Sequence, residues 1–499
     1  MSTQRRPPRT ELAPGLEIPR IVTGLWQVAD QERGGTPLDP TLASADLAAY
    51  AAAGFDAFDM ADHYGSAEVI TGHLLNTPAA GAAKPPMRAF TKWCPPPGPM
   101  TAEVVRAGVM RSIERLRVPR IDLLQFHWWT FEHPDWLDAM EELARLRAEG
   151  LIAHVGLTNF DTAHLRVLLA EGVPVASNQV CCSLLDRRAT EQMSTLCLAR
   201  GVKLLAYGTL GGGFLSERWL GAPAPAEGRE FADWSKMKYR RFIEAIGGWG
   251  ALQRVLQAAS RIGGKHGASI ANVATRWVLE QPAVAAVIVG ARLTEREHRA
   301  DNLKLFDFAL DDEDRARLAE AFAGTQRIPG DCGDEYRRPP FLTASGDLSH
   351  HLEALPKVYE RQAAPGDADG HPRWRVSSAS QWEPLAGYSR AVRSGQRILV
   401  SGTTATHGAG RLVGRGDAAA QATWILDKIG AALSSLGGRL EDVVRTRVYL
   451  TDVADCDAVA REHGRVFGHV RPANTLLQVA ALVGEGYRVE IEAEAEVAA

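Results

Sequence analysis

Short apolar runs of strand length recur through the first 290 residues and alternate with segments of helical periodicity. Eight such runs lie at residues 21–26, 57–62, 88–93, 121–128, 154–159, 175–180, 203–208 and 284–291. Buried strands that alternate with helices indicate parallel β-α units, and eight units can close a barrel. The pattern therefore predicts an α/β fold with an N-terminal (β/α)8 TIM barrel over residues 21–325, after a short tail at 1–20.

Within the barrel region, residues 209–283 are longer than one strand-to-strand connection needs, and we expect an excursion over the barrel mouth there.

A second periodic region follows the barrel. Residues 326–372 are rich in Pro, Gly, Asp, His and Arg and predict a linker. Residues 373–499 then show a strand pair, a long amphipathic helix, a strand, a second helix and two further strands. This order predicts an α+β domain whose two helices cover one face of the sheet.

Composition and charge narrow the class of protein. The chain has 45% hydrophobic and 23% charged residues and a net charge of −4, which argues against a basic protein that coats nucleic acid. The six cysteines lack C-x-x-C or Cys/His ligand spacing, which argues against a structural metal site and fits a reducing compartment. No apolar run has secretory or membrane-spanning length. We expect a soluble, cytoplasmic protein that binds no metal, nucleic acid or membrane.

Polar residues close three consecutive predicted strands. Asp59 and Tyr64 follow the second strand, Lys92 ends the third and His127 ends the fourth. Taken singly, each has a structural explanation, such as a loop cap, a half-buried aromatic, a surface charge or a core histidine. Because barrel closure brings the carboxyl ends of the strands together, the four residues indicate one shared site.

The chemistry of these four side chains points to carbonyl reduction. A tyrosine with its ordinary pKa of about 10 is a poor acid at neutral pH, and an adjacent ammonium lowers that pKa. Lys92 would be the ammonium, Asp59 would keep it protonated, and His127 would donate to the oxygen on which charge develops. Tyr64 would then act as general acid once a hydride donor is present.

These residues lie in motifs that resemble the aldo-keto reductase family over about residues 15–325. The motifs are D-x-x-x-x-Y-G (59–65), T-K (91–92), I-D-L-L-Q-x-H (121–127), G-L-I-x-x-V-G-x-T-N (150–159), N-Q-V (178–180) and A-Y-G-T-L-G-G-G-F-L (206–215). The resemblance implies that Asp59, Tyr64, Lys92 and His127 form the catalytic tetrad and that NADPH is the cofactor.

The same resemblance implies the cofactor contacts. Thr158, Asn159 and Gln179 would hold the nicotinamide carboxamide, Tyr207 would stack on its ring, and the loop from Gly208 to Leu215 would cradle the pyrophosphate through backbone amides. Arg292, more than Arg296, would meet the 2′-phosphate, and Asn302 the adenine. The full set is Trp26, Thr158, Asn159, Gln179, Tyr207, Gly208, Leu210, Gly212, Arg292, Arg296 and Asn302.

Tryptophans follow the ends of several barrel strands. Trp26, Trp93, Trp128 and Trp129 either wall the substrate pocket or pack beneath the loops. If they wall it, the pocket suits a bulky apolar or aromatic aldehyde or ketone, or a sugar-like ring stacked on an indole. Lys92 is the one evident cation for a substrate carboxylate.

Residues 384–499 resemble the RidA family of imine/enamine deaminases, which are trimers of a chorismate-mutase-like α+β fold. The matching segments are 384–392, 398–406, 437–452, 467–475 and 487–497. Tyr388, Ser401 and Glu490 match pocket positions of that family, but Asn474 stands where deamination uses an arginine. An amide cannot replace the bidentate guanidinium–carboxylate pair. The domain is therefore interpreted as trimerising or ligand-binding.

Three functions stay open on the sequence. The first is an NADPH-dependent carbonyl reductase that acts on a small molecule and forms a homotrimer through its C-terminal domain. The second is a bifunctional enzyme in which that domain hydrolyses an imine and the barrel reduces the released carbonyl. The third is an NADPH-binding redox sensor or assembly module without turnover, against which the intact tetrad counts.

Overall fold

Parallel strands close into the predicted barrel. The computed structural model describes residues 5–30, 32–83, 85–226, 234–338, 355–365 and 372–498. Within these ranges, eight strands follow one another around the barrel, and the last pairs with the first. They are β3 (Ile21–Gly24), β4 (Ala57–Asp59), β5 (Arg88–Trp93), β6 (Ile121–His127), β7 (Ile152–Thr158), β8 (Val175–Cys181), β9 (Lys203–Tyr207) and β10 (Val284–Gly290). Each overlaps one predicted apolar run, so the predicted TIM barrel is confirmed.

Helices surround the barrel and begin at residues suited to that position. Thr101 accepts a hydrogen bond from the backbone of Val104, and Asp311 forms a reciprocal capping box with Asp314. The barrel helices are α1 (Pro40–Ala52), α2 (Ala67–Leu75), α3 (Pro78–Ala82), α4 (Ala102–Leu116), α5 (Trp136–Ala148), α6 (Thr162–Ala170), α7 (Gln192–Arg200), α8 (Trp234–Ala245), α9 (Trp249–His266), α10 (Ile270–Leu279), α11 (Arg299–Lys304) and α12 (Asp312–Ala323).

The N-terminal segment belongs to the barrel and corrects the predicted tail at 1–20. Strands β1 (Arg9–Ala13) and β2 (Leu16–Pro19) form an antiparallel hairpin. Its Leu12, Leu16 and Ile18 are buried with Phe90 and Leu205 of the barrel strands. The hairpin thus closes the amino-terminal end of the barrel. Two strands of four or five residues hold too few apolar positions to show a period in the sequence.

The expected linker at 326–372 contributes to both domains at its ends. Residues 331–336 are mostly buried against the barrel and include the short 3-10 turn Asp334–Tyr336. Further on, β11 (Gln362–Ala364) pairs with the C-terminal sheet. The interval 209–283 holds α8, α9 and α10, and α8 lines the cavity described below. The rest of the expected linker lies largely outside the described residues.

The C-terminal domain is an α+β sandwich, as predicted. In the part of the chain that the structure describes, its main sheet has the order β11-β12-β13-β14-β19-β17-β18. The elements are β12 (Arg373–Val376), α14 (Trp382–Ala386), β13 (Ala391–Ser394), β14 (Arg397–Thr404), β15 (Thr406–His407), β16 (Arg411–Leu412), α15 (Ala418–Ser435), β17 (Val443–Leu450), α16 (Cys456–Phe467), β18 (Ala473–Gln478) and β19 (Val489–Glu496).

The two faces of this sheet differ because strand side chains alternate. In β19, Val489, Ile491, Ala493 and Ala495 are buried, and the strand packs against α15. Glu490, Glu492 and Glu494 point to the opposite face and are only partly buried. The helices therefore cover one face of the sheet, and the other face carries glutamates.

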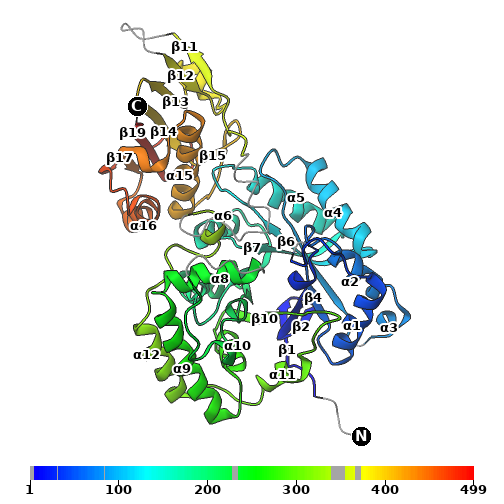
Figure 1. The fold of residues 1–499 in the computed structure, drawn as a ribbon. Helices are drawn as coiled ribbons and strands as arrows, with labels where there is room; N and C mark the ends of the chain where they lie inside the picture. Colours follow the sequence, from blue (N-terminus) through cyan, green and yellow to red (C-terminus); the bar gives the residue numbers. More distant parts are fainter. Residues whose placement is uncertain are drawn as a thin grey trace.

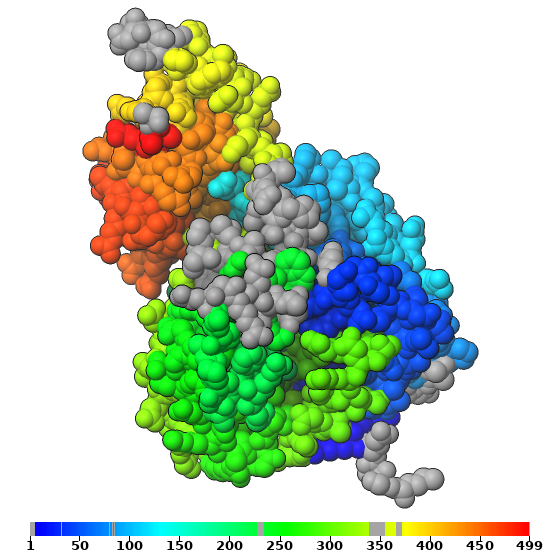
Figure 2. All heavy atoms as spheres, viewed as in Figure 1, coloured from blue at the N-terminus to red at the C-terminus, as the bar shows by residue number. Residues whose placement is uncertain are grey.

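The two domains pack directly on each other through α15 and α6 (Figure 1). The Trp136 and Trp424 rings meet edge to face, with centroids 5.6 Å apart. His164 on α6 bridges Asp161 Oδ1 at 2.6 Å and Asp427 Oδ2 of α15 at 2.9 Å. Figure 2 shows the C-terminal lobe, in yellow to red, seated on the barrel lobe, in blue to green. The domains thus share an interface of aromatic rings and ion pairs.

None of the six cysteines forms a disulfide in the described structure, and five of them are buried. Among the described residues, no helix is both long and apolar enough to cross a membrane.

Candidate active site

A cavity of about 480 Å³ opens at the carboxyl ends of the barrel strands. Asp59, Tyr64, Lys92 and His127, the four residues singled out from the sequence, all line it. They come from β4, the turn after it, β5 and β6. The barrel therefore brings the predicted tetrad together, at the end where TIM barrels carry their chemistry.

Lys92 is held as a buried cation. Its Nζ donates to Asp59 Oδ2 at 2.5 Å and to the Met60 carbonyl at 3.0 Å. The other oxygen of Asp59 accepts from the side-chain amides of Gln125 at 2.8 Å and Gln179 at 2.7 Å. Because a buried charge is costly unless it is paired and hydrogen-bonded, this network allows both charges to exist in the cavity.

Tyr64 lies beside this cation. The Lys92 Nζ is 5.1 Å from the centroid of the Tyr64 ring. The ring is half-buried and packs edge-on against Trp26 at 5.0 Å and His63 at 4.8 Å. A phenol held next to an ammonium has the arrangement that promotes proton donation.

His127 is a neutral imidazole with one nitrogen available. Burial lowers its pKa well below the ordinary value, and the nearby Arg337 charge adds to this effect. Its Nδ1 lies 3.8 Å from Cys94 Sγ, and the ring stacks at a tilt on Trp129, 4.3 Å between centroids. Its buried Nε2 has no hydrogen-bond partner among the described residues. A neutral imidazole with a free Nε2 can donate to a substrate oxygen.

The expected carboxamide site contains an unsatisfied hydroxyl. Thr158 Oγ1 is buried, lines the cavity and has no partner among the described residues. Asn159 follows it at φ +56, and its Oδ1 accepts from Tyr207 Oη at 2.8 Å. Gln179 lies on the next strand and also lines the cavity. The unpaired Thr158 hydroxyl and the side-chain amides of Asn159 and Gln179 thus lie along one part of the cavity wall. Such groups can form hydrogen bonds with the carboxamide of a nicotinamide.

The glycine loop fits a pyrophosphate. Gly208 and Gly212 have φ of +73 and +64, which favour glycine. A Cβ at Gly212 would come within 2.8 Å of Tyr239 Cδ2 and 2.9 Å of the Ser235 carbonyl. Gly208, Leu210 and Gly212 all line the cavity. Both the backbone conformation and the packing of α8 therefore require glycine at position 212, and the backbone of the loop borders the cavity.

The two arginines expected at the 2′-phosphate lie in different places relative to the cavity. Arg292 and Asn302 line the same cavity, as expected. Arg296 is exposed and does not line the cavity in the described part of the chain. Arg292 pairs loosely with Glu295 at 3.8 Å, which leaves its guanidinium able to meet a phosphate.

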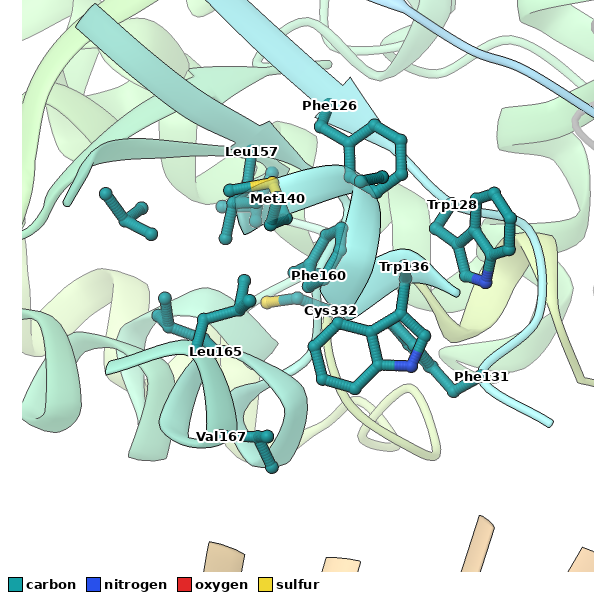
Figure 3. Packing of buried hydrophobic residues seen from close by; sticks show 14 of the residues in the cluster. Phe126, Trp128, Phe131, Trp136, Met140, Leu157, Phe160, Leu165, Val167 and Cys332 are labelled. Carbon is teal, nitrogen blue, oxygen red and sulfur yellow. The ribbon is translucent and has the colours of Figure 1, made fainter. Parts of the chain in front are cut away.

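Two of the four tryptophans expected in the substrate pocket lie elsewhere. Trp26 and Trp129 line the cavity, whereas Trp93 and Trp128 do not among the described residues. Trp128 is fully buried in an apolar cluster outside the cavity (Figure 3), where its Nε1 donates to the His133 carbonyl at 3.1 Å. Trp93 lies outside the cavity because side chains alternate along a strand. Lys92 points into the barrel, so Trp93 points outward, onto Gly108 of α4.

Sequence reasoning missed a further cation and a phenol in the cavity. Lys238 of α8 and Tyr336 both line it, and the Lys238 Nζ donates to Tyr336 Oη at 2.7 Å. The phenol of Tyr336 and the Glu335 carboxylate raise the pKa of Lys238, so it stays charged despite burial. Lys92 is thus not the only cation here.

Buried ion pairs hold Tyr336 in place. Arg188 Nη2 contacts Asp186 at 2.7 Å and Glu335 at 2.8 Å. Arg337 donates to the Asn159 carbonyl at 2.7 Å and to the Trp128 carbonyl at 2.6 Å. Charged residues anchor this segment, so it has no apolar period and resembles a linker in the sequence.

The predicted pocket residues of the C-terminal domain only partly meet. Ser401 donates its hydroxyl to the Ser389 carbonyl at 2.8 Å, and Arg390 lies 5.8 Å from the Tyr388 ring. Glu490 lies against Gly402, and burial raises its pKa. Asn474 is instead on β18, two strands from β19, and donates to Thr446 Oγ1 at 2.9 Å. Thr446 also contacts His463 of α16. Within one chain, Asn474 therefore lies apart from the other three predicted pocket residues.

With this geometry established, comparisons with known proteins identify the class. Residues 20–323 match the aldo/keto reductase family, and residues 378–497 match the endoribonuclease L-PSP family, to which RidA-type domains belong. The first match covers more than half of the chain. The protein is therefore a member of the aldo/keto reductase family with a C-terminal RidA-type domain.

Individual relatives each match part of the chain. An uncharacterized protein of Streptomyces coelicolor is 41% identical over 121 residues, 24% of this chain and 90% of that protein. Flagellar radial spoke protein 5 of Chlamydomonas reinhardtii is 33% identical over 177 residues, 32% of this chain but only 33% of its own length. The glycerol dehydrogenase structure from Gluconobacter oxydans covers 66% of this chain and 98% of its own, with a TM-score of 0.51 and 22% identity. That likeness shows the fold alone.

Proposed function

We propose that the barrel reduces an aldehyde or ketone to an alcohol with NADPH, and that Tyr64 is the general acid. The observation that carries the proposal is the buried Lys92–Asp59 pair beside Tyr64, in a cavity that His127 Nε2 also borders. When bound in this cavity, a reduced nicotinamide would be the source of the hydride for the carbonyl carbon. Tyr64 gives its proton to the carbonyl oxygen, and Lys92 stabilises the resulting phenolate.

NADPH is preferred over NADH because Arg292 stands at the cavity beside Asn302. Thr158, Asn159 and Gln179 would hold the carboxamide, and Tyr207 would lie under the ring. The loop at Gly208 to Leu215 would bind the pyrophosphate. Each of these assignments rests on residues that line one continuous cavity.

The substrate is a hydrophobic, preferably aromatic, carbonyl compound. Trp26, Trp129 and Tyr336 supply aromatic walls on the side of the cavity near Tyr64 and His127. Aromatic side chains bind flat apolar ligands well at low entropic cost. Lys238 is already engaged by Tyr336, which makes it a weak attractor for a substrate carboxylate.

For the C-terminal domain we favour assembly into a homotrimer over imine hydrolysis. The sheet face opposite the helices presents Leu399 and Leu477, 47% and 51% exposed, beside the Glu490 row. Apolar side chains on such a face are better covered than exposed. An amide at position 474 offers no bidentate partner for a carboxylate, and nothing in the geometry favours the bifunctional alternative.

The test is Tyr64→Phe in the full chain, with NADPH absorbance and a panel of aromatic aldehydes. We expect turnover to fall by about 100-fold or more because phenylalanine has no proton to give. Cofactor binding, followed by fluorescence, should be nearly unchanged. Tyr449→Phe is the matched control, since it removes a phenol that donates to Glu492 in the other domain. Near wild-type turnover in Tyr64→Phe would overturn the mechanism.

A further inference from the structure

Three side chains of the kinds that bind zinc meet at the wall of the catalytic cavity. Asp62 and His63 lie in the turn after β4, and Cys94 directly follows β5. A carboxylate oxygen, a ring nitrogen and the sulfur of these residues all lie within 4.8 Å of one another. The side chains of Asp62 and His63 are 13% and 12% exposed, and His63 lines the cavity, so an ion can reach them.

The three residues are already in contact. His63 Nδ1 is 3.2 Å from Asp62 Oδ1, and the other oxygen of Asp62 accepts from the Cys94 backbone N–H at 3.3 Å. Tetrahedral zinc, with bonds of about 2.0 to 2.3 Å, places its ligand atoms about 3.5 Å apart. Side-chain shifts of about 1 Å would therefore suffice to close the site.

The donor set suits zinc better than a harder cation. Sulfur, imidazole nitrogen and carboxylate oxygen are the ligands that Zn²⁺ takes in proteins, whereas Mg²⁺ and Ca²⁺ require oxygen. One thiolate and one carboxylate balance the two charges of the ion, which lowers the cost of placing it in a partly buried wall. Water from the cavity would complete the tetrahedron.

We propose that Asp62, His63 and Cys94 bind Zn²⁺ and that zinc bound there inhibits carbonyl reduction. The second part rests on the proposed reductase function; the first does not. On binding, the Cys94 thiol gives its proton to solvent and the sulfur bonds to the metal.

The inhibition would act through the proton of His127. Cys94 Sγ lies 3.8 Å from His127 Nδ1. A thiol can donate to Nδ1 and thereby leave the ring proton on Nε2, the nitrogen that faces the substrate. A zinc-bound thiolate can only accept, so it favours the tautomer with the proton on Nδ1. A neutral imidazole in that tautomer has no Nε2–H to donate to a carbonyl oxygen.

Cobalt binding to the cofactor-free full chain tests the site itself. Co²⁺ should give a thiolate-to-cobalt charge-transfer band that Zn²⁺ displaces. Cys94→Ala should abolish the band, and Cys456→Ala, a free thiol of the other domain, should retain it. Absence of the band in the wild type, or its survival in Cys94→Ala, would overturn the site.

Inhibition by Zn²⁺ tests the consequence, with each variant compared with its own zinc-free rate. His63→Gln removes a half-buried ligand without opening the core and serves as the second variant. Both His63→Gln and Cys94→Ala should raise the inhibitory zinc concentration by about tenfold or more, and a chelator should restore the wild-type rate. A cobalt band without zinc inhibition would overturn the second part. If no carbonyl is reduced at all, the proposed function fails and the cobalt experiment still decides the site.

Discussion

Two neighbouring arginines offer a controlled test of cofactor choice at the scale of single residues. Arg292 lines the cavity and Arg296, four residues on, is exposed outside it. Both substitutions to alanine remove the same charge from the same loop. Any difference between them therefore reports position and not net charge.

We expect Arg292→Ala to weaken NADPH binding by about tenfold or more and NADH binding much less, because the 2′-phosphate exists only in NADPH. Arg296→Ala should change both little. Fluorescence titration of each variant with both cofactors measures the effect. Equal losses for NADPH and NADH in Arg292→Ala would place the 2′-phosphate elsewhere.

At the scale of elements, the contact of α6 with α15 depends on a buried histidine. His164 is 2% exposed, stacks on Phe131 at 3.4 Å and lies between Asp161 and Asp427. Burial by itself would lower the pKa of His164, but the negative charges of these two carboxylates have the larger effect and raise it above the ordinary value. The pKa of Asp161 is lowered by His164, so that carboxylate stays charged over the same range.

This histidine makes the domain contact pH-dependent. Because the folded pKa is raised, its contribution to stability is fully present below the ordinary pKa of about 6.5 and is lost as pH rises through the folded pKa. We expect Asp427→Asn to lower the free energy of unfolding by about 1 to 3 kcal/mol at mildly acidic pH and by less at alkaline pH.

Asp417→Asn is the matched control for this measurement. Asp417 is on the same domain, equally buried, and pairs with Arg166 at 3.4 Å across the same interface. Arg166 does not titrate in this range, so the loss of stability in Asp417→Asn should be independent of pH. Thermal unfolding of both variants at about pH 6 and pH 9 distinguishes them; parallel losses would exclude His164 as the titrating group.

For the whole molecule, the two domains have separable tasks in the proposed scheme. A chain that ends at residue 338 keeps the barrel with Glu335, Tyr336 and Arg337. We expect it to bind NADPH and reduce aldehydes but to form a smaller assembly than the full chain. It should also unfold at a lower temperature, since Trp136 and the α6 surface lose their cover.

Light scattering and activity on both chains check this expectation. A chain that ends at residue 325 is the informative companion, because it also lacks Tyr336 and the buried Arg188–Glu335 pair. It should bind cofactor and substrate worse than the chain that ends at 338. A monomeric full-length chain would rule out the trimerising role of the C-terminal domain.

The sequence by itself determined the architecture and pointed to the four residues of the proposed catalytic set. Eight apolar runs that alternate with helical segments suffice to predict a barrel because buried parallel strands carry continuous apolar residues. Asp59, Tyr64, Lys92 and His127 could be found because each lies at or just after the carboxyl end of a strand, and these ends share one face of a barrel. The order of strands and helices over residues 373–499 likewise predicted a sheet covered on one face, and the alternation of buried and half-buried residues in β19 agrees with this.

Only the tertiary structure decided which side chains turn into the cavity. Trp93 and Trp128 were expected there and point away, since a strand's orientation fixes each neighbour's side. Lys238 enters from α8 and Tyr336 from a segment that the buried Arg188–Glu335 pair anchors, and the meeting of these two side chains leaves no trace in the local sequence. The meeting of Asp62 and His63 with Cys94 is of the same kind: no ligand spacing exists along the chain, and two adjacent strand ends create it in space.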